Sequence, residues 1–170
     1  MMSFGLAYAL GVAGTLLEWR AYQLQCGRGF RRFSAVAALL WGGMYALLGA
    51  WTAAFTMAST ALRTLLSGWL ETHPHKSLAA IAFLCLFAGL TALSWQGPVS
   101  LLPAFAVINT TLALFYLGNR QMRMALLASS AAWIANDIVW QAWPALVAEV
   151  MAVGLNVRTI RRLPVSAAIG

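Results

Sequence analysis

One apolar stretch of the chain, residues 122–142, carries side chains whose types and spacing suit the binding of a small polar ligand. Trp133, Asn136, Asp137 and Trp140 stand at positions i, i+3, i+4 and i+7, so a helix places all four on one face. An indole ring offers a flat surface for stacking, while amide and carboxylate groups fix a ligand's orientation through hydrogen bonds. We therefore predict that Trp133 and Asn136 contact a substrate.

Two other apolar stretches also contain polar side chains. Glu149 and Asn156 share a helical face within residues 143–160, and Asn109 lies near the middle of residues 99–118. We predict Asn109 and Asn156 as substrate-binding residues, with hydrogen bonds to a neighbouring helix as the alternative. Asp137 and Glu149 are interpreted as a carboxylate pair that shares a proton and supports proton coupling, or alternatively as groups exposed to an outward-facing vestibule. Glu18 is assigned no role.

The composition indicates which elements hold these residues. Of the 170 residues, 62% are hydrophobic and only 9% are charged, with a mean hydropathy of +0.78. Soluble domains carry about a quarter charged residues. Apolar segments of about 18–21 residues, the length with which a helix crosses about 30 Å of hydrocarbon, recur along the chain. Seven of them are predicted as transmembrane helices: residues 4–22, 33–50, 51–70, 77–95, 99–118, 122–142 and 143–160.

The distribution of charge predicts how these helices are oriented. Eleven Lys and Arg against four Asp and Glu, a net charge of +7, would suit nucleic acid only on a soluble basic face. Instead the basic residues follow the first, third, fifth and seventh segments, and the connections at 49–51, 96–100 and 141–144 hold none. Because cytoplasmic loops are enriched in Lys and Arg, the N-terminus is predicted outside and the C-terminus in the cytoplasm, with no nucleic-acid partner.

A shift of the sequence by 92 residues reveals an internal repeat. It aligns Arg31 with Arg123, Trp41 with Trp133 and Trp51 with Trp143, and, after a further three-residue offset, Arg63 with Arg158. The predicted fold class is therefore an all-α integral membrane protein with seven transmembrane helices in a 3+1+3 arrangement. A first three-helix unit covers residues 1–70, an inverting linker helix lies within 71–97, and the second unit covers 98–170.

The repeat gives the first unit an aromatic counterpart to the polar face of the second. Trp41 and Tyr45 occupy the positions that correspond to Trp133 and Asp137, and both tryptophans are predicted near the middle of the membrane. We predict Trp41 and Tyr45 as substrate-binding residues. Packing at the interface between the units is the alternative for the two tryptophans.

Arg63 and Arg158 lie near the inner ends of the third and seventh segments. They are predicted to attract an anion to the cytoplasmic mouth of the protein. The alternative is that both side chains extend to the membrane interface and set the topology.

Four short motifs carry a family resemblance: Arg63-Thr64-Leu65, Leu101-Leu102-Pro103, Trp133-Ile134 and Gly154-Leu155-Asn156. The sequence resembles the YgjV family of bacterial inner-membrane proteins over nearly its whole length, and its layout looks like that of the SWEET, MtN3 and PnuC carriers. The resemblance implies a site near the middle of the bacterial inner membrane, framed by Trp41, Trp133 and Asn156. The Pro-Gln motifs of the SWEET group are missing, since Pro103 is not followed by Gln.

These features favour a secondary carrier or facilitator that moves a small solute by alternating access around a cavity between the units. The alternative is a non-transporting scaffold that reuses the same fold. A ligand-sized cavity that touches both Trp41 and Trp133 would favour the carrier, whereas a tightly packed middle would favour the scaffold. No enzymatic activity, cofactor or metal is predicted; the expected partners are the lipid bilayer and the solute, and a homo-oligomer is left open.

Overall fold

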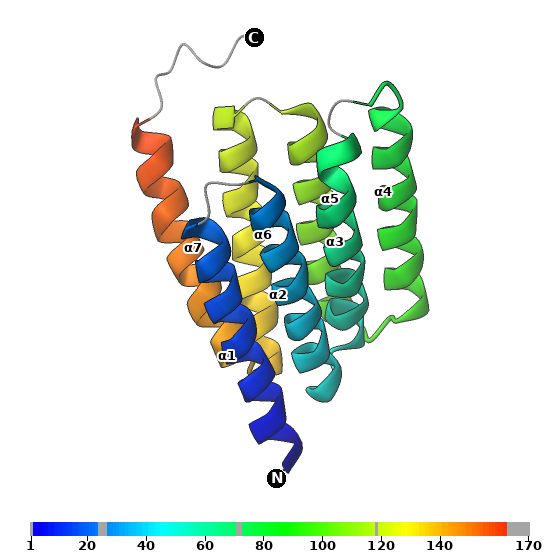
Figure 1. Ribbon diagram of the computed structural model, residues 1–170. Helices are drawn as coiled ribbons and strands as arrows, with labels where there is room; N and C mark the ends of the chain where they lie inside the picture. The colour runs from blue at the N-terminus through cyan, green and yellow to red at the C-terminus, as the bar shows by residue number, and fades with distance from the viewer. Residues whose placement is uncertain (1, 24–26, 71–72, 118, 163–170) are drawn as a thin grey trace.

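The computed structural model describes residues 2–23, 27–70, 73–117 and 119–162, and its arrangement is shown in Figure 1. Within these residues the chain is all-helical and has no strands, as predicted. The seventh helix ends at Arg162, so the tail of the predicted second unit, residues 163–170, lies outside the described residues. The elements are α1 (Met2–Gln23), α2 (Gly27–Leu47), α3 (Trp51–Leu70), α4 (Lys76–Leu93), the 3-10 turn η1 (Pro98–Ser100), α5 (Leu101–Tyr116), α6 (Asn119–Trp140) and α7 (Trp143–Arg162).

The surface of the bundle is apolar on all sides of the helices. Large side chains such as Leu16, Leu62, Leu78, Leu93 and Val147 are exposed, with Leu93 at 89%. Among the described helices, α4 and the continuous stretch Pro98–Tyr116 are long and apolar enough to cross a membrane by length and composition. An apolar exterior of this extent suits lipid rather than water as the surrounding solvent.

The helices pack in chain order and close into a ring. α1 packs on α2 and α2 on α3, and in the same way α5 packs on α6 and α6 on α7. Contacts of α1 with α7 and of α3 with α5 join the two groups. α4 packs against α3 and α5 from outside this ring, at one edge of the bundle in Figure 1. Space between the two groups is therefore bordered by helices from both halves of the chain.

The turns that end α2 and α6 are alike in detail. Each contains a residue in the left-handed region, Gly49 (φ 81°) in one turn and Gln141 (φ 54°) in the other. In each, this residue donates to the carbonyl three positions back, and the next residue donates to the carbonyl five positions back, which is the Schellman motif. The bonds that span five positions run from the amide of Ala50 to the carbonyl of Tyr45 (2.9 Å) and from the amide of Ala142 to the carbonyl of Asp137 (2.8 Å). The same turn therefore recurs 92 residues along the chain.

The three-residue offset that aligned Arg63 with Arg158 is wrong. α3 begins at Trp51 and α7 at Trp143, and both run for 20 residues without interruption. An unbroken helix keeps its register, so the 92-residue shift continues through both helices and the counterpart of Arg63 is Leu155. Arg158 lies about one turn beyond that position.

Small residues let α1 approach its neighbours closely. A Cβ atom at Gly11 would lie 2.4 Å from the sulfur of Met44 on α2 and 2.9 Å from Cβ of Pro144 on α7. The hydroxyl of Thr15, one turn further along, lies 3.2 Å from the Pro144 carbonyl oxygen. At this level α1 is thus held against both α2 and α7, which is the close packing that glycine permits between membrane helices.

Candidate functional site

A cavity of about 620 Å³ lies between the two groups of helices. Its lining comes from α1, α3, α5, α6 and α7, and this volume is within the usual range of small-molecule sites. The residues of the lining that bear on binding are Glu18, Arg63, Arg123, Trp133, Glu149 and Asn156.

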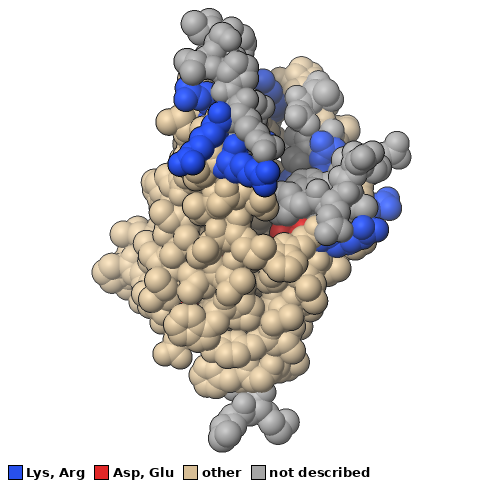
Figure 2. Space-filling view, turned by 90° about the vertical axis from the view of Figure 1, so that its left-hand side faces the viewer, with Lys and Arg blue, Asp and Glu red and all other residues tan. Residues whose placement is uncertain are grey.

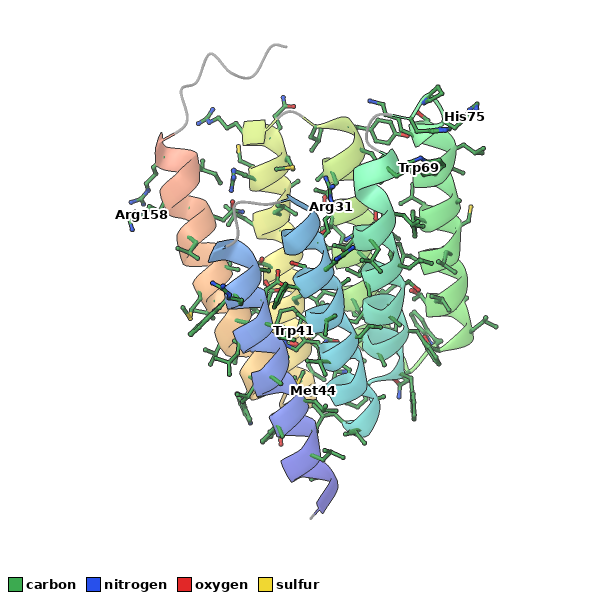
Figure 3. The ribbon with its side chains drawn as sticks, viewed as in Figure 1. Arg31, Trp41, Met44, Trp69, His75 and Arg158 are labelled. Atoms are coloured by element: carbon green, nitrogen blue, oxygen red, sulfur yellow. The ribbon has the colours of Figure 1, made fainter. Side chains whose placement is uncertain are left out.

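Lys and Arg gather at the same end of the bundle as this cavity. Figure 2 shows them around one end of the visible face, which is hollowed there, with an acidic side chain visible below the hollow. Figure 3 places Arg31 and Arg158 toward that end, and Trp41 and Met44 further down the bundle. Arg123 in the second turn of α6 and Asn156 near the end of α7 line the cavity at the basic end.

Arg63 turns inward from α3. Only 5% of the side chain is exposed, and its Nη1 donates to the hydroxyl of Thr111 (2.7 Å) and to the carbonyl of Val107 (3.4 Å). The guanidinium lies 5.8 Å from the centre of the Phe87 ring, within the range of a cation–π contact. The alternative in which Arg63 extends to the membrane interface is therefore wrong. Arg158 is exposed near the end of α7 and is absent from the cavity lining.

Glu18 and Glu149 face the cavity from α1 and α7. Both also line an adjoining cavity of about 90 Å³, which Trp41 and Trp19 border as well. Ser34 donates to Oε1 of Glu18 at 3.2 Å, while Oε2 of Glu18 is buried and has no hydrogen-bond partner among the described residues. Glu18 was not predicted, although a carboxylate inside residues 4–22 is costly enough in a membrane to mark a functional group.

Tyr45 and Asp137 meet where α2 and α6 face each other. The phenol of Tyr45 donates to Oδ1 of Asp137 at 2.5 Å, and both side chains are at most 1% exposed. The Tyr45 ring also stacks on Trp133, with ring centres 5.9 Å apart and an interplanar angle of 22°. The two bonded residues are 92 positions apart, so corresponding positions of the two turns are in direct contact.

The hypothesis that Asp137 and Glu149 hydrogen-bond as a pair is wrong for this structure. Oδ1 of Asp137 accepts from Tyr45, and Oδ2 is buried without a hydrogen-bond partner among the described residues. Glu149 instead lines the cavity with Glu18. The two carboxylates predicted to form a pair therefore occupy different environments.

The other predicted binding residues divide into two groups. Trp133 and Asn156 line the cavity, whereas Tyr45, Asn109 and Asn136 do not. The amide of Asn109 donates to the carbonyl of Ala125 (2.6 Å) and to the hydroxyl of Ser129 (2.8 Å), so it joins α5 to α6. Asn136 is 1% exposed, one residue before Asp137.

Asn156 connects α7 to α6. Its amide nitrogen donates to the carbonyl of Arg123 (2.9 Å), and its amide oxygen accepts from the guanidinium of the same residue (3.2 Å). Trp41 lies outside the larger cavity; its indole ring meets Gly14, where a Cβ atom would lie 2.9 Å from Nε1. The two tryptophans thus line adjoining cavities, and neither of these cavities touches both rings, although the prediction for a carrier required one that does.

The cavity lining keeps the 92-residue relation between the halves of the chain. Four pairs of lining residues are related by this shift: Glu18 and Thr110, Met57 and Glu149, Thr60 and Ala152, and Arg63 and Leu155. In each pair the two side chains differ in charge or polarity. The helices that frame the cavity therefore correspond in position, while the groups that they present are unlike.

Chemically, the cavity combines one aromatic surface, an amide, several hydroxyls and charges of both signs. Besides Glu18, the hydroxyls of Thr60, Thr110 and Ser129 were not predicted. Their residue types carry no distinguishing signal, because Ser and Thr in membrane helices most often bond to carbonyls or neighbouring helices. The arrangement suits recognition of a small polar molecule with an apolar part.

Comparison with known proteins places the chain in a family. The family model described as "Bacterial inner membrane protein" (Imp-YgjV) matches residues 5–166. The chain belongs to the YgjV family of bacterial inner membrane proteins. It is similar to the inner membrane protein YgjV of Escherichia coli (strain K12), with 29% identity over 138 residues that cover 81% of this chain and 73% of that protein. No solved structure matches the chain.

Membership of the YgjV family agrees with the apolar exterior and establishes the location as the bacterial inner membrane. The family match extends over every described helix and includes the whole cavity lining. The site is therefore built within the region that defines the family.

Proposed function

We propose that this YgjV-family protein is a secondary carrier or facilitator that moves a small solute across the bacterial inner membrane. The observation that carries the proposal is the cavity of about 620 Å³ enclosed by helices from both halves of the chain. A cavity of this size between two corresponding groups of helices is where carriers built from repeats hold their substrates. The proposal includes no enzymatic activity and no cofactor.

The proposed architecture is the 3+1+3 arrangement, with α1–α3 and α5–α7 as parallel repeats and α4 as the inverting linker. The matching turns after α2 and α6 support it, as does the position of α4 outside the ring. With the basic end in the cytoplasm, the N-terminus lies outside. In this layout the protein is similar to the SWEET, MtN3 and PnuC carriers.

Alternating access would proceed by opening of the end opposite to the basic residues. That end is held by hydrogen bonds between elements: Tyr8 to the Gln141 carbonyl (3.1 Å), Gln96 to the Gly49 carbonyl (2.8 Å) and Thr52 to the Ser94 carbonyl (2.7 Å). The Tyr45–Asp137 bond lies next to this end. Of these bonds, those of Tyr8 to Gln141 and of Tyr45 to Asp137 join the two units, so rocking of one unit against the other would exchange their partners.

Uptake into proteoliposomes tests the proposal. The full chain is reconstituted and screened for saturable uptake of a panel of labelled amino acids, sugars, nucleosides and organic acids. We expect saturable flux of at least one solute, and at least a tenfold loss with Trp133→Ala, which removes the aromatic wall of the cavity. Leu93→Ala, on the lipid-facing side of α4, serves as the matched control and should leave flux unchanged. Absence of saturable flux of every solute from folded protein would overturn the proposal.

One observation favours the second candidate, a non-transporting scaffold. Tyr45 covers one face of Trp133, so the space between α2 and α6 is filled. A scaffold predicts that a strain in which Trp133, Asn136 and Asp137 are all replaced keeps the wild-type phenotype. A carrier predicts loss of the phenotype in that strain.

A further inference from the structure

We propose that the cavity binds a small zwitterion, with the anionic group of the solute on Arg63 and the cationic group on Glu149 and Glu18. The inference rests on the proposed carrier function and names the chemical class of its substrate. It follows from how charges are distributed over the cavity walls.

Arg63 contributes a positive charge to the cavity wall from α3. Its guanidinium is buried, lines the cavity, and has no hydrogen bond or salt bridge with a carboxylate among the described residues. Nη1 donates both of the hydrogen bonds that Arg63 makes among the described residues, so neither Nη2 nor Nε is used in them. A buried cation without a counter-ion is unfavourable, and a guanidinium fork matches the two oxygens of a carboxylate. Arg63 is thus suited to an anionic group brought by the solute.

The carboxylates on α1 and α7 face the same space. Glu18 and Glu149 line the same two cavities. Oε2 of Glu18 is buried without a partner among the described residues. An ammonium group supplies three donors and a positive charge, which satisfies both carboxylates at once. A simple anion would be repelled here.

Arg63 and Glu149 lie on different walls of the cavity. Arg63 belongs to α3 and Glu149 to α7, the corresponding helices of the two groups. The counterpart of Arg63 is Leu155 and that of Glu149 is Met57, so each charge has an apolar counterpart. Glu149 is also six positions nearer the start of its helix, which is about 9 Å along the axis. A ligand that reaches both walls needs both signs of charge, separated from each other.

The remaining walls suit the uncharged part of such a molecule. Trp133, Met57 and Leu126 provide apolar contact, and Ser129 and Thr110 provide hydroxyls. A neutral sugar would leave the guanidinium and the carboxylates without charged partners, and a simple cation would meet Arg63. A zwitterion is the class that supplies a group of opposite charge both to Arg63 and to the carboxylates of Glu18 and Glu149.

Ligand binding to the full chain in detergent micelles tests this inference. Thermal stabilisation is measured with the twenty proteinogenic amino acids and their ω-amino analogues, and Kd is then determined for each zwitterion that binds. For each of these, the deaminated acid and the decarboxylated amine are measured as matched probes. We expect saturable binding of at least one zwitterion, and at least a tenfold higher Kd for both matched probes. This comparison uses the unaltered protein, so it does not depend on whether a variant folds.

Variants assign each end of the ligand. Arg63→Gln should raise the Kd of the zwitterion at least tenfold, to the Kd of the matched amine. Arg63→Lys should keep the tighter binding of the zwitterion over the amine. Glu149→Gln should raise the Kd of the zwitterion to that of the matched deaminated acid. Arg161→Gln is the charge-matched control. It removes one exposed arginine from the last turn of α7, at the basic end of the bundle, and should leave each Kd unchanged. Equal binding of zwitterion and acid by the unaltered protein, or binding of neutral sugars alone, would overturn the inference.

The carrier proposal and the zwitterion proposal fail in different ways. Zwitterion binding without flux in proteoliposomes would overturn the carrier and leave the binding assignment standing. Saturable flux of a sugar or a simple anion, with no binding of zwitterions, would keep the carrier and overturn the assignment. Absence of binding by every zwitterion also overturns the assignment.

Discussion

The two groups of helices, α1–α3 and α5–α7, share a backbone plan but differ in the side chains that they direct toward each other. Their second helices end in the same turn, and their third helices begin at Trp51 and Trp143 and have the same length. Yet Tyr45 in the first group corresponds to Asp137 in the second. Backbone geometry is thus retained where it determines the turns, while side chains diverge where the groups meet.

Symmetry explains why the divergence is useful. In the proposed arrangement of two repeats, a residue on the twofold axis between them meets its own counterpart. Two tyrosines or two aspartates at these positions would not combine one donor with one charged acceptor, and two aspartates would repel. Because the counterparts are Tyr45 and Asp137, a single hydrogen bond joins the groups. The same reasoning applies to the cavity, where Arg63 has Leu155 as its counterpart.

Making the two units alike at Arg63 should have the largest effect. Arg63→Leu copies the corresponding residue, Leu155, and removes the charge-assisted contact that we propose for the solute, so kcat/KM for uptake should fall about 100-fold. The fold should persist, because the hydroxyl of Thr111 still donates to the Val107 carbonyl at 2.7 Å. Proteoliposome uptake beside Arg161→Gln checks this, and undiminished uptake would contradict the assigned role.

Breaking the contact on the axis should have the next largest effect. Tyr45→Phe leaves the Asp137 carboxylate buried without its donor and should lower the free energy of unfolding by about 2 kcal/mol. Replacing Asp137 by Asn in addition should recover part of that loss, since a neutral amide is less costly to bury. Unfolding of Tyr45→Phe, Asp137→Asn and the double variant in mixed micelles, beside the unaltered protein, gives the coupling energy. A coupling of zero would mean that the bond does not hold the groups together.

Adding a methyl group at a glycine should have a smaller effect, which should differ between Gly11 in α1 and Gly154 in α7. Gly11→Ala places a methyl group against Met44 and Pro144, so we expect a loss of about 1.5 kcal/mol in unfolding free energy. Gly154→Ala in α7 is the matched control, because nothing lies within 4 Å of a Cβ atom there. That control should be neutral or slightly stabilising. Equal effects of the two substitutions would show that α1 is not closely packed.

The smallest effect should come from making the turns identical. Gln141 has a positive φ of 54°, which costs free energy for a residue with a side chain. Gly49, with a φ of 81°, has no side chain and avoids this cost. Gln141→Gly should therefore stabilise the protein by about 1 kcal/mol, and Gly49→Ala should destabilise it by a similar amount. Thermal unfolding of both variants checks the prediction. A loss of stability with Gln141→Gly would mean that the Gln side chain itself supports the turn.

Much of the fold follows from local patterns in the sequence. Apolar runs bounded by polar residues predicted seven helices, and each overlaps a helix in the structure, although α2 begins at Gly27, ahead of the predicted start at residue 33. Part of the site was predicted in the same way, since Trp133 and Asn156 are costly or conspicuous in an apolar segment and do line the cavity. The hydrogen bonds of Asn109 to α6 were the predicted alternative to substrate binding, and that alternative is confirmed. The bond of Tyr45 to Asp137 could not be predicted, because the partner of a polar group in a helix depends on which neighbour packing brings close.

The sequence by itself determined the helices, the likeness between the two halves and the concentration of basic residues at particular connections. These properties depend on hydrophobic length and on residues near each other in the chain. Only the tertiary structure decided that Arg63 turns inward, that Glu18 joins Glu149, and that Asp137 bonds to Tyr45 rather than to Glu149. Each of these depends on the rotation of one helix against another, and that rotation is set by packing across the whole bundle rather than by any one segment.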